Sequence, residues 1–152
     1  MKILVDADAC PVKKIIEKIA MEYHVPVTMF IDTCHELYSD YSEIIIVSKA
    51  PDAVDFALMN QAKKGDIVVT GDYGVAAMAL SKGANAIHQG GMLYTDDKID
   101  RMLLERHLAK VNRKSGKRNP HIKGPKKRTS EDDMRFEIML RDLIRSILKN
   151  IE

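Results

Sequence analysis

Two carboxylates follow the first hydrophobic run of the chain. Asp6 and Asp8 come directly after Ile3-Leu4-Val5 and shortly before Pro11, where an amphipathic stretch begins. Hard divalent cations prefer oxygen ligands, and the end of a strand holds such ligands on a rigid edge. The spacing therefore predicts a divalent-cation site to which Asp6 and Asp8 contribute.

Two further acids are placed for the same edge of a sheet. Asp72 ends the run Val68-Val69-Thr70-Gly71, and Asp55 lies one turn into a helix expected after the third strand. In doubly wound sheets, functional groups gather at the carboxyl ends of the strands, where the strand order reverses. Carboxylates crowded in a partly desolvated cleft repel one another unless a cation neutralises them, which favours Mg²⁺ or Mn²⁺. The expected metal ligands and catalytic groups are Asp6, Asp8, Asp55 and Asp72.

Most of these acids also have a structural interpretation. Asp72 precedes a helix and can cap it, Asp52 and Asp55 have the spacing of a capping pair, and Asp8 can cap the helix that begins near Pro11. Asp6 resists such a reading, because the last residue of a central parallel strand is usually buried and an unpaired buried carboxylate is costly.

Short β-rich runs alternate with helical patterns along the chain, which is typical of βαβ units. Continuous apolar strands suit a parallel sheet covered by helices on both faces. The sequence therefore predicts an α/β fold, a three-layer α/β/α sandwich around a mainly parallel sheet of about five strands. Strands are expected at residues 3–5, 27–31, 44–47, 67–69 and 86–88, with helices after Pro11, over 52–64, after Asp72 as far as Gly83, after Thr95, and from Ser130 onward.

Three parts are expected along the chain. Residues 1–110 form the α/β domain, 111–129 form a basic irregular loop, and 130–152 form an amphipathic helix. Ser130 and Asp133 have the spacing of a capping box for that helix. Its long apolar stripe predicts packing on the same domain or on a partner, and it makes a homodimer through this helix possible.

The charge distribution is uneven. Residues 110–128 contain nine Lys or Arg and no acid. Because the whole chain has a formal net charge of +2, the remaining residues carry a net charge of −7 (2 − 9 = −7). Such a basic segment is typical of polyanion-binding arms, although a solvated linker has the same composition. The expected partner is nucleic acid, with RNA favoured over DNA. The expected binding residues are Lys114, Lys117, Arg118, Lys126, Lys127 and Arg128.

Other features limit the class of protein. No apolar stretch approaches the ~20 residues that span a bilayer, and the first residues lack a signal-peptide core. A cytoplasmic protein with no membrane partner is expected. The two cysteines, Cys10 and Cys34, have no CxxC spacing and are expected to be reduced, and the histidines show no metal-ligand spacing.

Three segments of the sequence carry a family resemblance. Residues 5–11 (VDADACP), residues 65–72 (GDIVVTGD) and the pair Gly124-Pro125 resemble the YaiI/YqxD family of bacterial proteins. That family is similar to PIN-domain nucleases, in which an acidic quartet on an α/β/α fold binds Mg²⁺ or Mn²⁺ and hydrolyses phosphodiesters with a water nucleophile. PIN domains usually offer a further acid near the last strand, where this chain has only Asp96 and Asp97 in an expected first helical turn. The resemblance implies that the quartet corresponds to Asp6, Asp8, Asp55 and Asp72.

Two alternatives remain open. A phosphatase resembling the haloacid dehalogenases would use Asp6 as a nucleophile and Asp8 as an acid/base, passing through an aspartyl phosphate. Cys10 replaces the usual Thr or Val of that family, and no Asp follows closely after Asp72. The other alternative is a non-catalytic module of the same fold that binds nucleic acid or protein.

Overall fold

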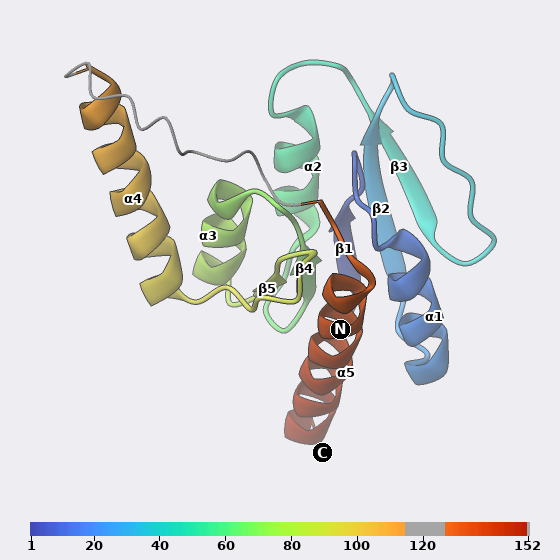
Figure 1. Ribbon diagram of the computed structural model, residues 1–152. Helices are drawn as coiled ribbons and strands as arrows, with labels where there is room; N and C mark the ends of the chain where they lie inside the picture. The colour runs from blue at the N-terminus through green and yellow to red at the C-terminus, as the bar shows by residue number, and fades with distance from the viewer. Residues whose placement is uncertain (115–126, 152) are drawn as a thin grey trace.

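A parallel sheet organises the part of the chain that the computed structural model describes, residues 1–114 and 127–151 (Figure 1). Five strands lie in the order β3-β2-β1-β4-β5, and the order reverses between β1 and β4. The predicted three-layer α/β class is confirmed. The strands are β1 (Ile3–Asp6), β2 (Val27–Asp32), β3 (Glu43–Val47), β4 (Ile67–Val69) and β5 (Asn85–Ile87), and the helices are α1 (Lys13–Tyr23), α2 (Ala53–Gln61), α3 (Tyr73–Ser81), α4 (Asp96–Lys114) and α5 (Ser130–Ile151).

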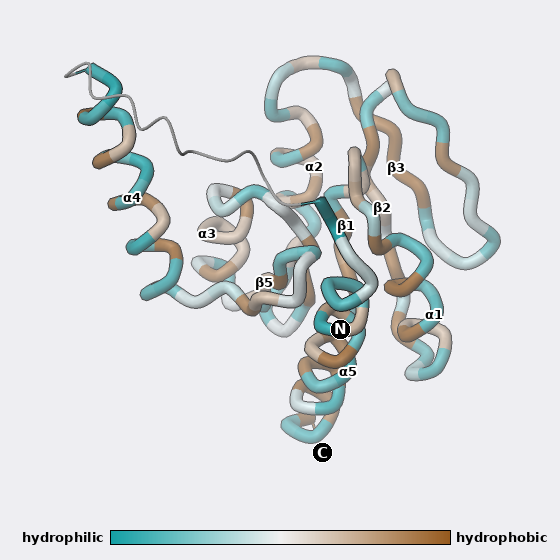
Figure 2. The backbone as a smooth tube through the Cα atoms, viewed as in Figure 1, coloured by the Kyte–Doolittle hydropathy of each residue, from teal (hydrophilic) through white to brown (hydrophobic). Residues whose placement is uncertain are grey.

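The central strands bury both of their faces, with the period of two that a pleated strand imposes. In β1, Ile3 and Val5 pack in the cluster that includes α1 and α5, whereas Leu4 packs in the cluster that includes α2 and α3. Figure 2 shows hydrophobic residues along the strands, and hydrophilic residues alternating with hydrophobic ones along α1 and α5. These two apolar layers hold the carboxyl ends of the strands in place.

The last helix, α5, packs on its own chain. Phe136, Leu140 and Ile144 are fully buried in the same cluster as α1. Gly91 allows the close approach, because its φ is +94° and a Cβ there would lie 2.8 Å from the carbonyl carbon of Arg135. The apolar stripe that suggested a homodimer is therefore largely covered within the chain, and the dimer stays a prediction.

The start of α5 differs from the expected capping box by one residue. The Thr129 N–H donates to the Asp132 carboxylate at 2.9 Å, whereas Asp133 pairs with Arg128. The pattern S/T-x-x-acid occurs in both registers, so spacing alone did not distinguish Thr129–Asp132 from Ser130–Asp133.

Two helix ends also differ from expectation. Helix α2 ends at Gln61 rather than at residue 64, and Gly65, with φ +87°, belongs to the turn that leads into β4. Helix α4 continues to Lys114, four residues into the predicted loop. Over the described residues, none of the helices has the length and apolar content that crossing a bilayer requires.

Candidate functional site

Asp6 ends β1 at the point where the strand order reverses. One of its oxygens accepts a hydrogen bond from the Thr70 hydroxyl at 3.2 Å. Burial raises the pKa of Asp6 to about 6, and the charge of Asp55 is the next cause, with smaller contributions from Asp8 and Asp72. The other three predicted acids therefore all act electrostatically on Asp6, although Asp55 and Asp72 lie far from it in the sequence.

Asp72 and Asp55 face this edge from α3 and α2. The Asp72 carboxylate accepts the Gly74 N–H at 2.7 Å, so its predicted role as a helix cap is confirmed. The Asp72 N–H in turn donates to the Thr70 hydroxyl at 3.0 Å. Burial raises the pKa of Asp55, followed by the charge of Asp72. A capping acid can thus belong to an acidic cluster as well.

Two other cap predictions were wrong. Asp52 precedes α2 with a left-handed φ of +63° and makes no side-chain cap. Helix α1 begins after Val12 without a side-chain cap, so Asp8 does not serve it. Both acids are free of helix-capping roles in the structure.

Asp8 instead contacts the end of β2. Its carboxylate accepts the Asp32 N–H at 3.4 Å and lies 3.1 Å from Nδ1 of His35. The same nitrogen lies 2.8 Å from Asp32, which raises the pKa of His35, and Asp8 adds to this shift. Asp32 and His35 were not among the site residues expected from the sequence. The signal was present for Asp32, because it ends the strand next to β1.

The carboxylate oxygens of the four predicted acids are suitable ligands for a hard divalent cation, but their spacing matches such a site only in part. Among the described residues, Asp6, Asp55 and Asp72 form no ion pair with Lys or Arg. The set of three ligand atoms within 4.8 Å of one another comes from Asp8, Asp32 and His35 rather than from the predicted quartet. Mg²⁺ usually keeps several waters and binds few carboxylates directly, so wider spacing is compatible with it.

A shallow cavity of about 310 Å³ opens beside these acids. Asp55 and Asp72 line it together with Phe56 and Met78, and the Phe56 side chain is 64% exposed. A larger cavity, of about 490 Å³, lies near Met1 and α5, and the described residues that line it include no carboxylate or imidazole. The smaller cavity can therefore bring a ligand to Asp55 and Asp72.

The basic residues predicted to bind nucleic acid fall into three groups. Lys114 is exposed at the end of α4, and Lys127 is exposed before α5. Arg128 donates to Asp133 and to the Gln89 carbonyl, both at 2.8 Å, so its guanidinium holds the start of α5 to the turn after β5. Lys117, Arg118 and Lys126 lie outside the described residues.

The strand order and the acidic edge together define a doubly wound α/β protein with a candidate cation site at the switch point. The chain belongs to the family described as "Uncharacterized BCR, YaiI/YqxD family", which matches residues 4–146 and confirms the resemblance.

Relatives of nearly the same length are similar to the chain throughout. The UPF0178 protein of Lachnoclostridium phytofermentans is 64% identical over 97% of this chain and 99% of its own length. That of Clostridium acetobutylicum is 62% identical, covering 95% and 97%, and that of Natranaerobius thermophilus is 44% identical, covering 95% and 96%. No solved structure matches the chain significantly.

Proposed function

We propose that this protein is a nuclease that depends on a divalent cation and hydrolyses phosphodiester bonds, with RNA as the favoured substrate. One observation carries the proposal. Burial raises the pKa of Asp6 to about 6 at the switch point, and repulsion from the carboxylates of Asp55, Asp8 and Asp72 adds to that shift. Natural sequences seldom retain such repulsion unless a ligand offsets it. The resemblance to PIN-domain nucleases points to the same chemistry.

The residues of the chain have separable roles in this proposal. Mg²⁺ or Mn²⁺, when bound, would neutralise the carboxylates, polarise a phosphate and lower the pKa of a water. Thr70 orients two of the acids, because its hydroxyl donates to Asp6 and accepts from the Asp72 N–H. Asp55 lines the adjacent cavity, where its charge would hold the cation rather than the phosphate.

The test is cleavage of a labelled RNA oligonucleotide with Mn²⁺, compared with the same reaction in chelator. Asp6→Asn and Asp55→Asn should each lower the cleavage rate by about 100-fold while binding of the RNA is retained. Asp142→Asn is the matched control, because Asp142 is exposed on α5. It should cleave at the rate of the unaltered protein.

The alternatives make different predictions in this test. A non-catalytic module would bind RNA without turnover and without a need for Mn²⁺, and Asp6→Asn would leave its affinity unchanged or higher. A phosphatase with Asp6 as nucleophile would be trapped by a fluoride phosphate analogue and would form a phosphoaspartate on a monoester substrate. Either result would replace the nuclease proposal.

A further inference from the structure

The two halves of α4 carry opposite charge. Residues 96–105 contain four acids and two bases, a net −2, whereas residues 106–114 contain four Lys or Arg and no acid, a net +4. None of these four bases forms an ion pair with an acid among residues 1–114 and 127–151. The basic half is therefore an exposed cationic surface that the fold of the described residues does not neutralise.

The basic side chains lie on one side of the helix. Arg106, Lys110 and Arg113 are spaced by four and three residues, which places them on one face. Continuing that spacing backward gives Met102 and Ile99 on the same face; Ile99 belongs to the core cluster that contains α3, and Met102 packs against it. The basic row thus extends the face by which α4 packs on α3, beyond the point where α3 covers it.

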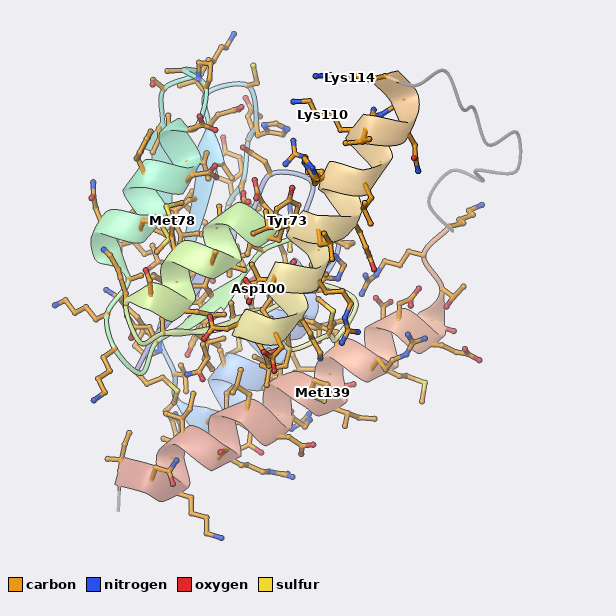
Figure 3. The ribbon with its side chains drawn as sticks, turned by 90° about the vertical axis from the view of Figure 1, so that its left-hand side faces the viewer. Tyr73, Met78, Asp100, Lys110, Lys114 and Met139 are labelled. Atoms are coloured by element: carbon orange, nitrogen blue, oxygen red, sulfur yellow. The ribbon has the colours of Figure 1, made fainter. Side chains whose placement is uncertain are left out.

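Arg106 links this row to the acidic edge. Its guanidinium donates to the Tyr73 hydroxyl and lies over the Tyr73 ring, 5.7 Å from the centroid. Tyr73 is the first residue of α3 and directly follows Asp72. Residues 107–114 then continue for about 12 Å along the helix axis. In Figure 3, Tyr73 lies beside the middle of α4, while Lys110 and Lys114 lie farther along and point toward the side where α2 lies.

We propose that Arg106, Lys110, Arg113 and Lys114 form the surface that binds the phosphate backbone of the nucleic acid, so that the strand passes over Tyr73 to Asp72. The acidic edge repels phosphates, and a neighbouring cationic row supplies the attraction that brings a polyanion there. Tyr73 holds the Arg106 guanidinium in a defined orientation, and its remaining N–H groups are suited to phosphate oxygens. This inference deepens the proposed function and rests on it for the identity of the ligand.

The surface adds three residues to the polyanion contacts expected from the sequence. Those contacts were expected in residues 111–129 and included Arg128, whose guanidinium is engaged by Asp133 and Gln89. Three of the four residues proposed here were not among those predicted. They belong to a helix, which holds them more rigidly than a loop would.

The test is binding of a fluorescein-labelled single-stranded RNA by anisotropy, in chelator, over a series of salt concentrations. The triple variant Arg106→Gln, Lys110→Gln, Arg113→Gln should bind about 10- to 100-fold more weakly near 0.1 M salt. The slope of log K against log salt should become shallower by about 2, since each lost single-strand phosphate contact contributes about 0.7. The matched control removes three exposed lysines elsewhere, Lys14→Gln, Lys63→Gln and Lys149→Gln, and should stay within about twofold of the unaltered protein.

Several outcomes of this binding assay would overturn the inference. Equal weakening in both triple variants would mean that net charge alone drives binding. Unchanged binding in the α4 variant, or no binding by the unaltered protein, would remove the surface altogether. Competition by polyglutamate at matched charge would indicate a partner with an acidic peptide. Because the assay contains chelator and measures no cleavage, RNA binding through α4 without any Mn²⁺-dependent cleavage would refute the nuclease proposal and leave the surface standing.

Discussion

Asp6 and Asp66 are acids at opposite ends of two paired strands, β1 and β4. Asp66 precedes β4, is 5% exposed, and accepts the backbone N–H groups of Lys2 and Lys63 at 3.1 and 2.9 Å. Asp6 ends β1, receives one hydrogen bond from Thr70, and otherwise faces acids that raise its pKa to about 6. A buried carboxylate that backbone amides satisfy stabilises the fold, whereas one surrounded by acids costs stability and indicates a ligand.

The largest expected effect is the loss of the Asp66 carboxylate. Asp66→Ala would leave two partly buried backbone N–H groups without their acceptor, so the free energy of unfolding should fall by about 3 kcal/mol. Urea denaturation measures this, with Asp40→Ala as an exposed control expected to be within about 0.5 kcal/mol of the unaltered protein. A small effect of Asp66→Ala would mean that the Asp66 carboxylate does not stabilise the fold.

The next effect concerns the ligand. Mn²⁺ at 100 times its dissociation constant should raise the free energy of unfolding by about 2.7 kcal/mol, because it binds the folded state. Thermal unfolding with and without Mn²⁺ measures this. Asp6→Asn and Asp55→Asn should abolish most of the stabilisation, whereas Asp40→Asn should retain it. If the unaltered protein gains no stability from any divalent cation, the acidic edge is not a cation site.

The third prediction is that removing the charge of Asp6 stabilises the fold, whereas removing the carboxylate of Asp66 destabilises it. The folded-state pKa of Asp6, about 6, lies above its ordinary value of 3.8, so the folded state binds more protons between these values and stability falls as pH rises through them. In chelator at pH 8, Asp6→Asn should therefore raise the free energy of unfolding by on the order of 1–2 kcal/mol after allowance for solvent screening.

The effect of Asp6→Asn on stability should depend on pH, so the same variant measured at low pH serves as a control. At pH 4 the carboxyl is already largely protonated in the folded protein, so the gain from Asp6→Asn should be much smaller there. Urea denaturation at both pH values measures the difference. A variant that is destabilised at pH 8 would show that Asp6 is satisfied in the fold, as Asp66 is.

The smallest effect is at the hydroxyl that joins two acids. Thr70→Val keeps the shape of the side chain but removes the donor to Asp6 and the acceptor for the Asp72 N–H. We expect a loss of about 1 kcal/mol in the free energy of unfolding and a higher pKa for Asp6. Carboxyl ¹³C NMR titration follows the pKa directly, and an unchanged value would mean that Thr70 does not contribute to the electrostatics of the site.

Local patterns predicted most of the architecture. Apolar runs and the helical stripes between them identified all five strands of the described sheet, and the rule about carboxyl ends of parallel strands selected Asp6 and Asp72. Locally, the pair Gly65-Asp66 indicates no more than a turn. The burial of Asp66 depends on the first residues of the chain, whose Lys2 N–H lies 64 positions away in sequence. The local sequence indicates the turn, but it does not indicate a hydrogen-bond partner so far away along the chain.

The two last helices show the same limit. Both α4 and α5 carry apolar residues at helical spacing, yet Phe136 and Leu140 of α5 are fully buried, whereas Leu104 and Leu108 of α4 are more than half exposed. Periodicity shows which residues share a face of a helix, and not whether another element covers that face.

By itself, the amino-acid sequence determined the alternation of strands and helices, the parallel sheet and the family, because these depend on hydrophobic period and short motifs along the chain. Only the tertiary structure decided that His35 meets Asp8 and Asp32, that Arg128 is bound to Asp133 and Gln89, and that Arg106 lies on Tyr73. Charge interactions depend on distance in space and on burial, and the folded chain sets both by bringing residues together across many sequence positions.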